Sequence, residues 1–499
     1  MGAKLFTAAV TAVGAFRTRS SRRRSFSSST NTGRKPRIAS PKKLTTPSIS
    51  NPKDVEKGDT VDGIEWADEQ NQVLAQVRCG SSVFITGSAG SGKTLLLQHI
   101  IGVLEQVHGP QKVFVTASTG VAACAIRGQT LHSFAAIGFG KADRDTLVDR
   151  VLLNKSATKR WKKVKALVID EVSMVDAEMF ENLEFIARQV KSSNKVWGGI
   201  QLVVSGDFFQ LPPITSQYGK QFAFEADCWD ASFDAQVELK KIFRQSDPRL
   251  IKLLDGMRKG KGDSEDLEVL KQSCLLSEPD SSVVRLYPRI EDVKRVNNER
   301  MESLGEQVFM YKAIDGGIDG FKRGIVADQL EICRGARVML IKNLDTKSQL
   351  CNGATGTVAG FFLAKQNSSL GEYLPLVRFD SGIQMIIEPE RWEIVEGGKV
   401  VAWREQIPLI LAWALSVHKC QGMTLDTLHT DLSRAFGYGM VYVALSRVRS
   451  LEGLSLSGFN PFKIKAHPKV VHFYEQLGSH KLLKDDEADD RMKEVCADC

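Results

Sequence analysis

Eight consecutive residues, Gly87 to Thr94, have the composition of a phosphate-binding loop. Its glycines allow backbone N–H groups to turn inward around phosphates. Lys93 would bind the β- and γ-phosphates, and Thr94 would offer its hydroxyl to Mg²⁺. The loop lies between an apolar run at 82–86 and a helix-like apolar run at 95–104. The sequence therefore predicts a nucleoside triphosphate site formed by Gly87, Ser88, Ala89, Gly90, Ser91, Gly92, Lys93 and Thr94.

Two adjacent carboxylates, Asp170 and Glu171, follow a second apolar run. At the end of a strand, Asp170 would hold Mg²⁺ through water, and Glu171 would polarise the water that attacks the phosphate. Gln210 follows a third apolar run, at 201–205. Because ligands of parallel sheets bind at the carboxyl ends of the strands, Gln210 is predicted to sense the γ-phosphate. These groups predict hydrolysis as well as binding.

The elements that would position these residues alternate along the chain. Apolar runs at 82–86, 112–117, 166–170 and 201–205 predict strands, and apolar residues at helical spacing between Met179 and Val190 predict a helix. This alternation is typical of an α/β fold with a parallel sheet covered by helices on both faces, expected to end near Leu239. From about 345 to 405 the pattern changes to short β-like runs separated by glycines, which predicts a small β-barrel inserted in a second lobe.

The net charge of +8 comes from one end of the 499-residue chain. Residues 1–53 contain twelve Lys and Arg and no acid, and the rest of the chain carries 55 basic and 59 acidic residues. A site for nucleic acid would therefore be a local groove rather than a generally basic surface. The longest apolar run, at 409–417, is too short to span a membrane, and we expect no membrane partner.

The basic, Ser-rich first segment is typical of a transit peptide, and predicts a mitochondrial location with the plastid, the nucleus or dual targeting as alternatives. The nine cysteines are scattered. The terminal pair, Cys496 and Cys499, is interpreted as part of a frayed acidic tail rather than a metal site, because no second pair accompanies it.

Several longer stretches occur in an order that resembles one helicase family. The chain resembles the superfamily-one DNA helicases of the Pif type (petite integration frequency) from about Trp66 to Gly458. It departs from the family pattern at Val196-Trp197, Ser416 and Cys420, none of which removes a charged group. The resemblance is carried by residues 170–174, 185–189, 198–202, 206–213, 416–425 and 442–447.

The resemblance implies a fold of two RecA-like P-loop lobes. The basic, polar segment between Phe134 and Trp161 is expected to be poor in helix and to form a wedge that splits the duplex, with a solvated loop as the alternative. The expected divisions are 1–60 (transit peptide and linker), 61–240 (first lobe, wedge at about 134–163), 241–478 (second lobe, β-barrel at about 345–405) and 479–499 (acidic tail).

The resemblance also implies roles for single residues. Gln70 matches the glutamine that reads adenine, and Arg244 and Arg447 match arginines that the second lobe sends to the γ-phosphate. Fixed cations are needed there because the transferred phosphoryl group carries negative charge. The expected catalytic residues are Lys93, Glu171, Gln210, Arg244 and Arg447, and the expected Mg²⁺ ligands are Thr94 and Asp170.

A track for single-stranded DNA is expected beside the nucleotide site. Hydroxyl groups and backbone N–H groups after a strand can bind DNA phosphates. Phe134 and Phe139 are candidates for base stacking, with a place in the core as an equal alternative. The expected DNA contacts are Ser118, Thr119, His132, His418, Thr424 and Tyr442.

The function implied is an ATP- and Mg²⁺-dependent DNA helicase that moves 5′ to 3′ on single-stranded DNA. Duplexes, forks, RNA–DNA hybrids and G-quadruplexes are the expected substrates, in replication, repair, recombination and genome or telomere maintenance. The expected state is a monomer that could dimerise on DNA. Three alternatives are the helicase domain of a mobile element, a DNA-binding protein whose ATPase is only a switch, and a P-loop ATPase that acts on protein and ignores DNA.

Overall fold

The computed structural model describes residues 65–477, except for short segments at 139–141, 214–219, 274–282, 318–325, 346–349, 351–352, 364–369, 371 and 397–398. The predicted transit peptide, Phe139, and the acidic tail with Cys496 and Cys499 lie outside the described residues.

The first lobe is built on a six-stranded sheet in which every neighbouring pair is parallel. Its order is β3-β2-β4-β5-β1-β6. The predicted strands and their end near Leu239 are confirmed. The strands are β1 (Val83–Gly87), β2 (Val113–Ala117), β3 (Gln129–Thr130), β4 (Ala166–Asp170), β5 (Gln201–Ser205) and β6 (Ala235–Leu239).

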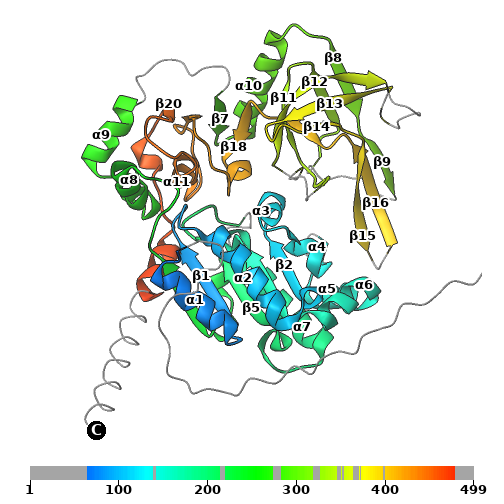
Figure 1. Ribbon diagram of the computed structural model, residues 1–499, viewed down its shortest axis with the longest axis vertical. Coiled ribbons are helices and arrows are strands. Elements are labelled where there is room, and N and C mark those ends of the chain that lie inside the picture. Colours follow the sequence, from blue (N-terminus) through cyan, green and yellow to red (C-terminus); the bar gives the residue numbers. More distant parts are fainter. Residues whose placement is uncertain are drawn as a thin grey trace, which may run out of the picture. The chain divides into compact units, whose positions relative to one another are not determined.

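Helices cover both faces of this sheet (Figure 1). Side chains along β1, β4 and β5 alternate between two apolar cores: in β1, Phe84 enters one core, and Val83 and Ile85 enter the other. The second of these cores contains α1 (Asp68–Arg78), α2 (Lys93–His108) and α3 (Gly120–Ala125), and the first contains α7 (Ala177–Lys191). The alternation explains why these three strands are mainly apolar on both sides, since neither face of the sheet meets water there.

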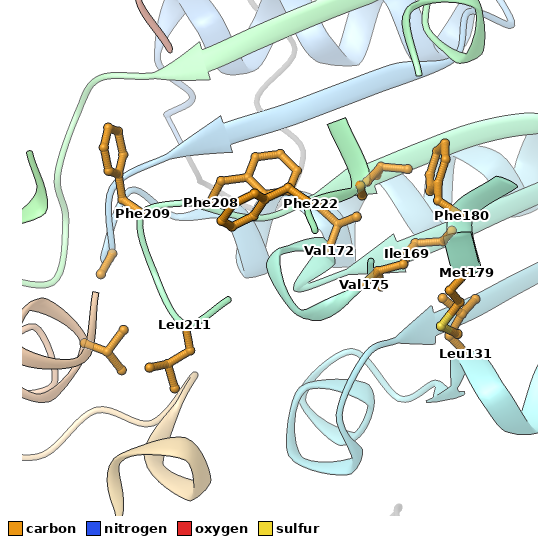
Figure 2. Close-up of a cluster of buried hydrophobic side chains, with 14 of the residues drawn as sticks. Leu131, Ile169, Val172, Val175, Met179, Phe180, Phe208, Phe209, Leu211 and Phe222 are labelled. Carbon is orange, nitrogen blue, oxygen red and sulfur yellow. The ribbon is translucent and has the colours of Figure 1, made fainter. Parts of the chain in front are cut away.

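Figure 2 shows part of the first core, including Phe180, Phe208 and Phe222. Trp229 joins these rings, with its centroid 5.0 Å from that of Phe84 and 5.2 Å from that of Phe180. The described residues 468–477 are helical, and Phe473 stacks on Phe224 at 4.4 Å. The end of the second lobe's sequence thus packs against the first lobe.

The expectation that the segment between Phe134 and Trp161 is poor in helix is wrong, and its role as a wedge stays a prediction. The segment folds as α4 (Leu131–Ala135), α5 (Arg144–Leu153) and α6 (Lys155–Lys163). Asp143 and Asn154 cap α5 and α6 by accepting N–H groups of their first turns. Trp161 is completely buried although basic residues surround it in sequence. The many lysines therefore obscured the apolar face of this helix in the sequence pattern.

Phe134 belongs to the core of this region and is not a base-stacking platform. Its side chain is completely buried, and its ring lies 4.8 Å from that of Trp161 and 5.2 Å from that of Phe114. Burial of a ring on all sides leaves no face for a nucleobase.

The second lobe contains a four-stranded parallel sheet in the order β18-β7-β19-β20. Its elements confirm the α/β character expected of a second RecA-like lobe. The strands are β7 (Val284–Tyr287), β18 (Ala414–Ser416), β19 (Leu428–Asp431) and β20 (Leu454–Gly458), and the helices are α8 (Pro248–Arg258), α9 (Ser264–Ser273), α10 (Ile290–Ser303) and α11 (Met440–Leu445).

The β-rich insertion between β7 and β18 begins before the expected residue 345 and has its own apolar core. It contains an antiparallel pair, a five-stranded sheet and a three-stranded sheet. Its strands are β8 (Val308–Lys312), β9 (Ile314–Gly317), β10 (Gln329–Cys333), β11 (Arg337–Leu340), β12 (Thr355–Leu363), β13 (Tyr373–Phe379), β14 (Gln384–Ile386), β15 (Glu390–Glu396), β16 (Lys399–Gln406) and β17 (Leu409–Leu411).

Replacement of Trp161 by alanine tests the packing of helices α4, α5 and α6. Trp161→Ala should lower the free energy of unfolding of the first lobe by about 3–5 kcal/mol, because it leaves a cavity among buried side chains. Urea denaturation followed by circular dichroism measures this loss. The exposed neighbour variant Lys159→Ala should change the transition little, and equal stability of the two variants would contradict the packing described.

Candidate active site

A cavity of about 300 Å³ lies where the phosphate loop faces the second lobe. The first lobe contributes Lys93, Thr94, Glu171 and Gln210 to its lining. The second lobe and the segment leading to it contribute Phe243, Arg244, Gly422, Thr424, Arg447 and Arg449. The structure therefore brings all five predicted catalytic residues to one cavity.

The phosphate loop connects β1 to α2 and depends on glycine at two close approaches. Gly90 and Gly92 have φ of 87° and 83°, in the left-handed region that side chains rarely adopt. A Cβ at Gly90 would lie 2.6 Å from the Cβ of Arg244, and one at Gly92 would lie 3.2 Å from Nε2 of Gln70. These glycines let both lobes approach the loop.

Lys93 lies buried at the start of α2. Its amino group donates to the carbonyl oxygens of Gly87 at 2.7 Å and Ser88 at 2.9 Å. Burial lowers the pKa of Lys93, and the nearby carboxylates of Asp207 and Glu171 oppose that shift. The loop thus holds the ammonium group at the position from which it can reach phosphate oxygens.

Gln70 lies in the first turn of α1, where its side-chain oxygen accepts the N–H of Ala67 at 3.0 Å. The residue is buried and touches the phosphate loop at Gly92. It does not line the cavity itself. The structure brings Gln70 to the loop, and its role in adenine recognition stays a prediction.

Asp170 and Glu171 follow β4, as predicted. Asp170 is buried, and its carboxylate accepts the backbone N–H of Glu171 at 2.9 Å. Burial, and then the charge of Glu171, raise the pKa of Asp170. A cation placed against Asp170 would stabilise its ionised form.

The oxygens of Asp170 and Thr94 suit Mg²⁺, which prefers hard oxygen ligands and is often held by one or two carboxylates together with phosphates. No group of three or more His, Cys, Asp or Glu that could hold a metal occurs in the part of the chain that the structure describes. Two oxygen donors leave coordination positions that nucleotide phosphates and water would fill, so Thr94 and Asp170 fit a metal ion bound together with the nucleotide.

Glu171 is held in a strained conformation by residues from both lobes. Its φ is 53°, which is unusual for a residue with a side chain. The hydroxyl of Ser118 donates to its carbonyl oxygen at 2.7 Å, and the amide of Gln421 donates to its carboxylate at 3.1 Å. Gln421 lies in a stretch that carried the family resemblance but was not predicted as a site residue.

The two arginines from the second-lobe side lie near each other in the cavity. Arg244 donates to the carbonyl oxygen of Ser446 at 3.0 Å. Burial and the charge of Arg447 lower the pKa of Arg244 to about 10. Gln245, which sequence reasoning missed, donates to the carbonyl oxygens of Ser446 and Val448 at 3.2 and 3.1 Å. An anion between the guanidinium groups would relieve their repulsion.

Two predicted DNA contacts lie at the nucleotide site instead. Thr424 lines the cavity beside the phosphate loop. Tyr442 is 2% exposed, and its hydroxyl accepts the N–H of Ala89 at 2.7 Å. The burial of Tyr442 contradicts its predicted contact with DNA, because neither the spacing nor the order of motifs shows which side of the lobe a residue faces. Thr424 is exposed, and its contact with DNA stays a prediction.

The other predicted DNA contacts lie outside the cavity. Ser118 and Thr119 are half-buried, and Thr119 caps α3 by accepting the N–H of Ala122 at 3.2 Å. His132 is half-buried on α4, and burial lowers its pKa. His418 lines a separate cavity of about 390 Å³ with Arg289, Ile290 and Phe436, at the carboxyl ends of β7 and β18. Contact of these four residues with DNA stays a prediction.

Comparison with known proteins identifies the family. A family model described as PIF1-like helicase matches residues 65–264, and one described as the 2B domain of DNA helicase Pif1 matches residues 322–361. The chain is 40% identical over 441 residues to the ATP-dependent DNA helicase PIF1 of Xenopus laevis, covering 87% of this chain and 68% of that protein. The chain belongs to the PIF1-like helicase family.

Other relatives agree with this assignment. The human ATP-dependent DNA helicase PIF1 is 40% identical over 436 residues, which are 85% of this chain and 66% of that protein. The chain thus spans about two thirds of the length of these curated relatives. The crystal structure of Pif1 helicase from Candida albicans matches with a TM-score of 0.77 and 38% identity, covering 83% of this chain and all of that chain. Bacteroides Pif1 bound to ssDNA matches with a TM-score of 0.69 and 28% identity, over 84% and 98% of the two chains.

Among the described residues, none of the helices has the length and apolar character needed to cross a bilayer.

Replacement of Lys93 tests the division between phosphate and DNA binding. Lys93→Ala should lower ATP turnover at least about a hundredfold, because it removes a fixed cation from the phosphates. Affinity for single-stranded DNA, measured by fluorescence anisotropy, should stay within about threefold. Glu105→Ala, an exposed change on the same helix, serves as the control. A Lys93 variant that is folded and turns over ATP normally would contradict the assignment.

Gln421→Ala tests the contact between the second lobe and Glu171. Loss of a hydrogen bond to a charged group is worth about 1.5–3 kcal/mol. We therefore expect kcat for ATP to fall about tenfold or more while ATP affinity stays unchanged. Gln98→Ala, which removes an exposed glutamine from α2, should leave kcat unchanged. Equal kcat values for the two variants would argue against a role for Gln421.

Proposed function

We propose that this chain is an ATP-dependent DNA helicase that moves 5′ to 3′ on single-stranded DNA and separates paired strands ahead of it. The observation that carries this proposal is the convergence of Arg244 and Arg447 with Lys93, Glu171 and Gln210 in one cavity. Membership of the PIF1-like helicase family supports it. Cations from both lobes would stabilise the negative charge on the transferred phosphoryl group. Closure of the lobes would therefore depend on ATP.

In this proposal each group at the cavity has a defined task. Lys93 and the loop N–H groups hold the phosphates, and Glu171 orients the attacking water. Magnesium, held by Thr94 and Asp170 and bound with the nucleotide, would neutralise charge on the phosphate oxygens. Gln210, buried at the cavity wall, senses whether the γ-phosphate is present.

In this proposal, Ser118 connects the expected DNA-binding loop to the acidic residues of the nucleotide site. Its hydroxyl holds the carbonyl group of Glu171, and its backbone N–H donates to the carbonyl oxygen of Asp170 at 3.1 Å. A DNA strand bound to the loop of Ser118 and Thr119 would therefore alter the positions of Asp170 and Glu171 through these two hydrogen bonds. This arrangement supports an ATPase that DNA stimulates.

The proposed partners are single-stranded and forked DNA. One matching structure is that of Bacteroides Pif1 bound to ssDNA, and another concerns DNA unwinding at forked dsDNA by two coordinating Pif1 helicases. The first supports the proposal that this chain binds single strands, and the second supports the proposal that two copies act together on forks. A monomeric state away from forks is also proposed. Activity on RNA–DNA hybrids and G-quadruplexes, and roles in replication, repair, recombination and telomere maintenance, are proposed from the family resemblance.

We also propose a mitochondrial location, with nuclear or dual targeting as the alternative. The support is the composition of residues 1–53, which are rich in Arg and Ser and contain no acid. Fluorescence microscopy of the full-length chain fused to a fluorescent protein at its C-terminus, compared with a chain starting at Asp54, distinguishes these locations.

Strand displacement tests the helicase proposal. ATPase activity should rise when single-stranded DNA is added, and a labelled strand should be released from a duplex with a 5′ tail and not from one with a 3′ tail. DNA-stimulated turnover without release from either substrate would favour the switch alternative. Turnover that ignores DNA would favour an ATPase that acts on protein.

Arg447→Ala tests the contribution of the second lobe to hydrolysis. An arginine that stabilises negative charge in the transition state raises kcat by about a thousandfold or more, so Arg447→Ala should lower kcat by that factor. ATP binding, measured by equilibrium titration with a fluorescent ATP analogue, should stay within about threefold. A variant with normal kcat would rule out this role for Arg447.

A further inference from the structure

Helix α11 of the second lobe contacts the phosphate loop through the hydroxyl of Tyr442. This hydroxyl accepts the N–H of Ala89 at 2.7 Å and donates to the carboxylate of Asp207 at 3.2 Å. Burial raises the pKa of Tyr442, so the hydroxyl keeps the proton that it donates. The bond is notable because Ala89 belongs to the loop that is expected to hold the phosphates.

Asp207 provides a rigid anchor for this hydroxyl. Its carboxylate is completely buried and forms an ion pair with Arg258 of α8, whose Nη2 and Nε lie 3.0 and 3.2 Å from Oδ1. Arg258 also pairs with Glu238 at 3.2 Å and lies over the ring of Phe209 at 4.8 Å. The hydroxyl of Tyr474, on the last described helix, lies 3.4 Å from the same carboxylate. Low dielectric around these groups makes each hydrogen bond costly to lose.

The segment that carries Tyr442 also fixes Arg447. Arg447 follows α11 after its C-cap Ser446, and its Nε donates to the carbonyl oxygen of Val443 at 2.9 Å. Its Nη2 donates to the hydroxyl of Ser446 at 2.7 Å. The guanidinium group is thus bound to its own helix, so a shift of α11 moves Arg447 relative to the phosphate loop.

Both partners of the Tyr442 hydroxyl belong to elements that hold the γ-phosphate site. Ala89 lies in the phosphate loop, and Asp207 begins the turn to Gln210, whose N–H donates to the carbonyl oxygen of Asp207 at 2.9 Å. These contacts make the hydroxyl a fixed point shared by the phosphate loop, the Gln210 turn and α11.

We propose that Tyr442 is a positioning residue for ATP hydrolysis, whose hydroxyl fixes α11, and with it Arg447, against the phosphate loop at Ala89 and against Asp207. This inference rests on the proposed role of Arg447 in hydrolysis. It gives Tyr442 a place in the ATPase reaction instead of a contact with DNA.

Tyr442→Phe removes only the hydroxyl and tests the proposal in the full-length chain. At saturating ATP and single-stranded DNA, kcat should fall about tenfold, because hydrogen bonds that align Arg447 in the transition state are lost. KM for ATP and affinity for single-stranded DNA should each stay within about threefold. A fall in kcat with unchanged KM and unchanged DNA affinity distinguishes a positioning role from a role in nucleotide binding or DNA contact.

Tyr311→Phe is the matched control. Tyr311 is also buried, and its hydroxyl donates to the carbonyl oxygen of Tyr373 at 2.9 Å inside the β-rich insertion. It loses the same chemical group at a site outside the ATPase cavity, and kcat should stay within about twofold of the parent. A Tyr442→Phe variant with unchanged kcat would overturn the proposal, as would lost DNA affinity with normal kcat at saturating DNA.

A double variant tests whether Tyr442 acts through Arg447. Single-turnover hydrolysis with excess protein measures slow rates in Arg447→Ala and in Arg447→Ala combined with Tyr442→Phe. The tenfold cost of Tyr442→Phe should disappear when Arg447 is absent, because residues that act as one unit are not additive. If Tyr442→Phe still lowered the rate tenfold in the absence of Arg447, the proposal that Tyr442 acts through Arg447 would be overturned. Normal hydrolysis by Arg447→Ala alone would instead refute the role of Arg447 in the proposed function.

Discussion

The positive charges that face the phosphate loop come from two lobes, and the rest of the structure serves to bring them together. Lys93 is fixed by the loop itself, whereas Arg244 and Arg447 are placed from the second-lobe side. Arg244 and Arg447 line one cavity, where burial and then the charge of Arg447 lower the pKa of Arg244. The cavity is therefore suited to a highly charged anion, and the binding energy of that anion can drive the lobes together.

The same cavity explains how a signal from DNA could reach the chemistry. Glu171 has an unfavourable backbone conformation that is maintained by Ser118 from the first lobe and Gln421 from the second. Backbone strain of this kind persists only where neighbouring contacts hold it in place. A change on either side would therefore alter the position of the residue that orients water. This property fits a motor better than a simple hydrolase.

The sequence could predict those parts that depend on local pattern. The phosphate loop, the strands that end at Asp170 and before Gln210, and the β-rich insertion have short signatures and were confirmed. Helix α6 was missed because its four lysines outnumber its two buried apolar residues, Ala157 and Trp161. Tyr442 was misplaced because helix α11 presents residues to two sides, and only packing shows that this hydroxyl reaches Ala89. The contact of Phe473 with the first lobe depends on parts of the chain that are far apart in sequence.

The central claim is that cations from both lobes stabilise the negative charge on the transferred phosphoryl group. The most direct test compares the affinities of two nucleotide complexes for the parent chain and for Arg447→Ala. ADP with aluminium fluoride imitates the phosphoryl group in transfer, whereas ADP alone lacks that charge. The account predicts that Arg447→Ala weakens binding of ADP with aluminium fluoride about a hundredfold or more and changes ADP affinity less than about threefold. Equal weakening of both complexes, or no weakening of either, would contradict it.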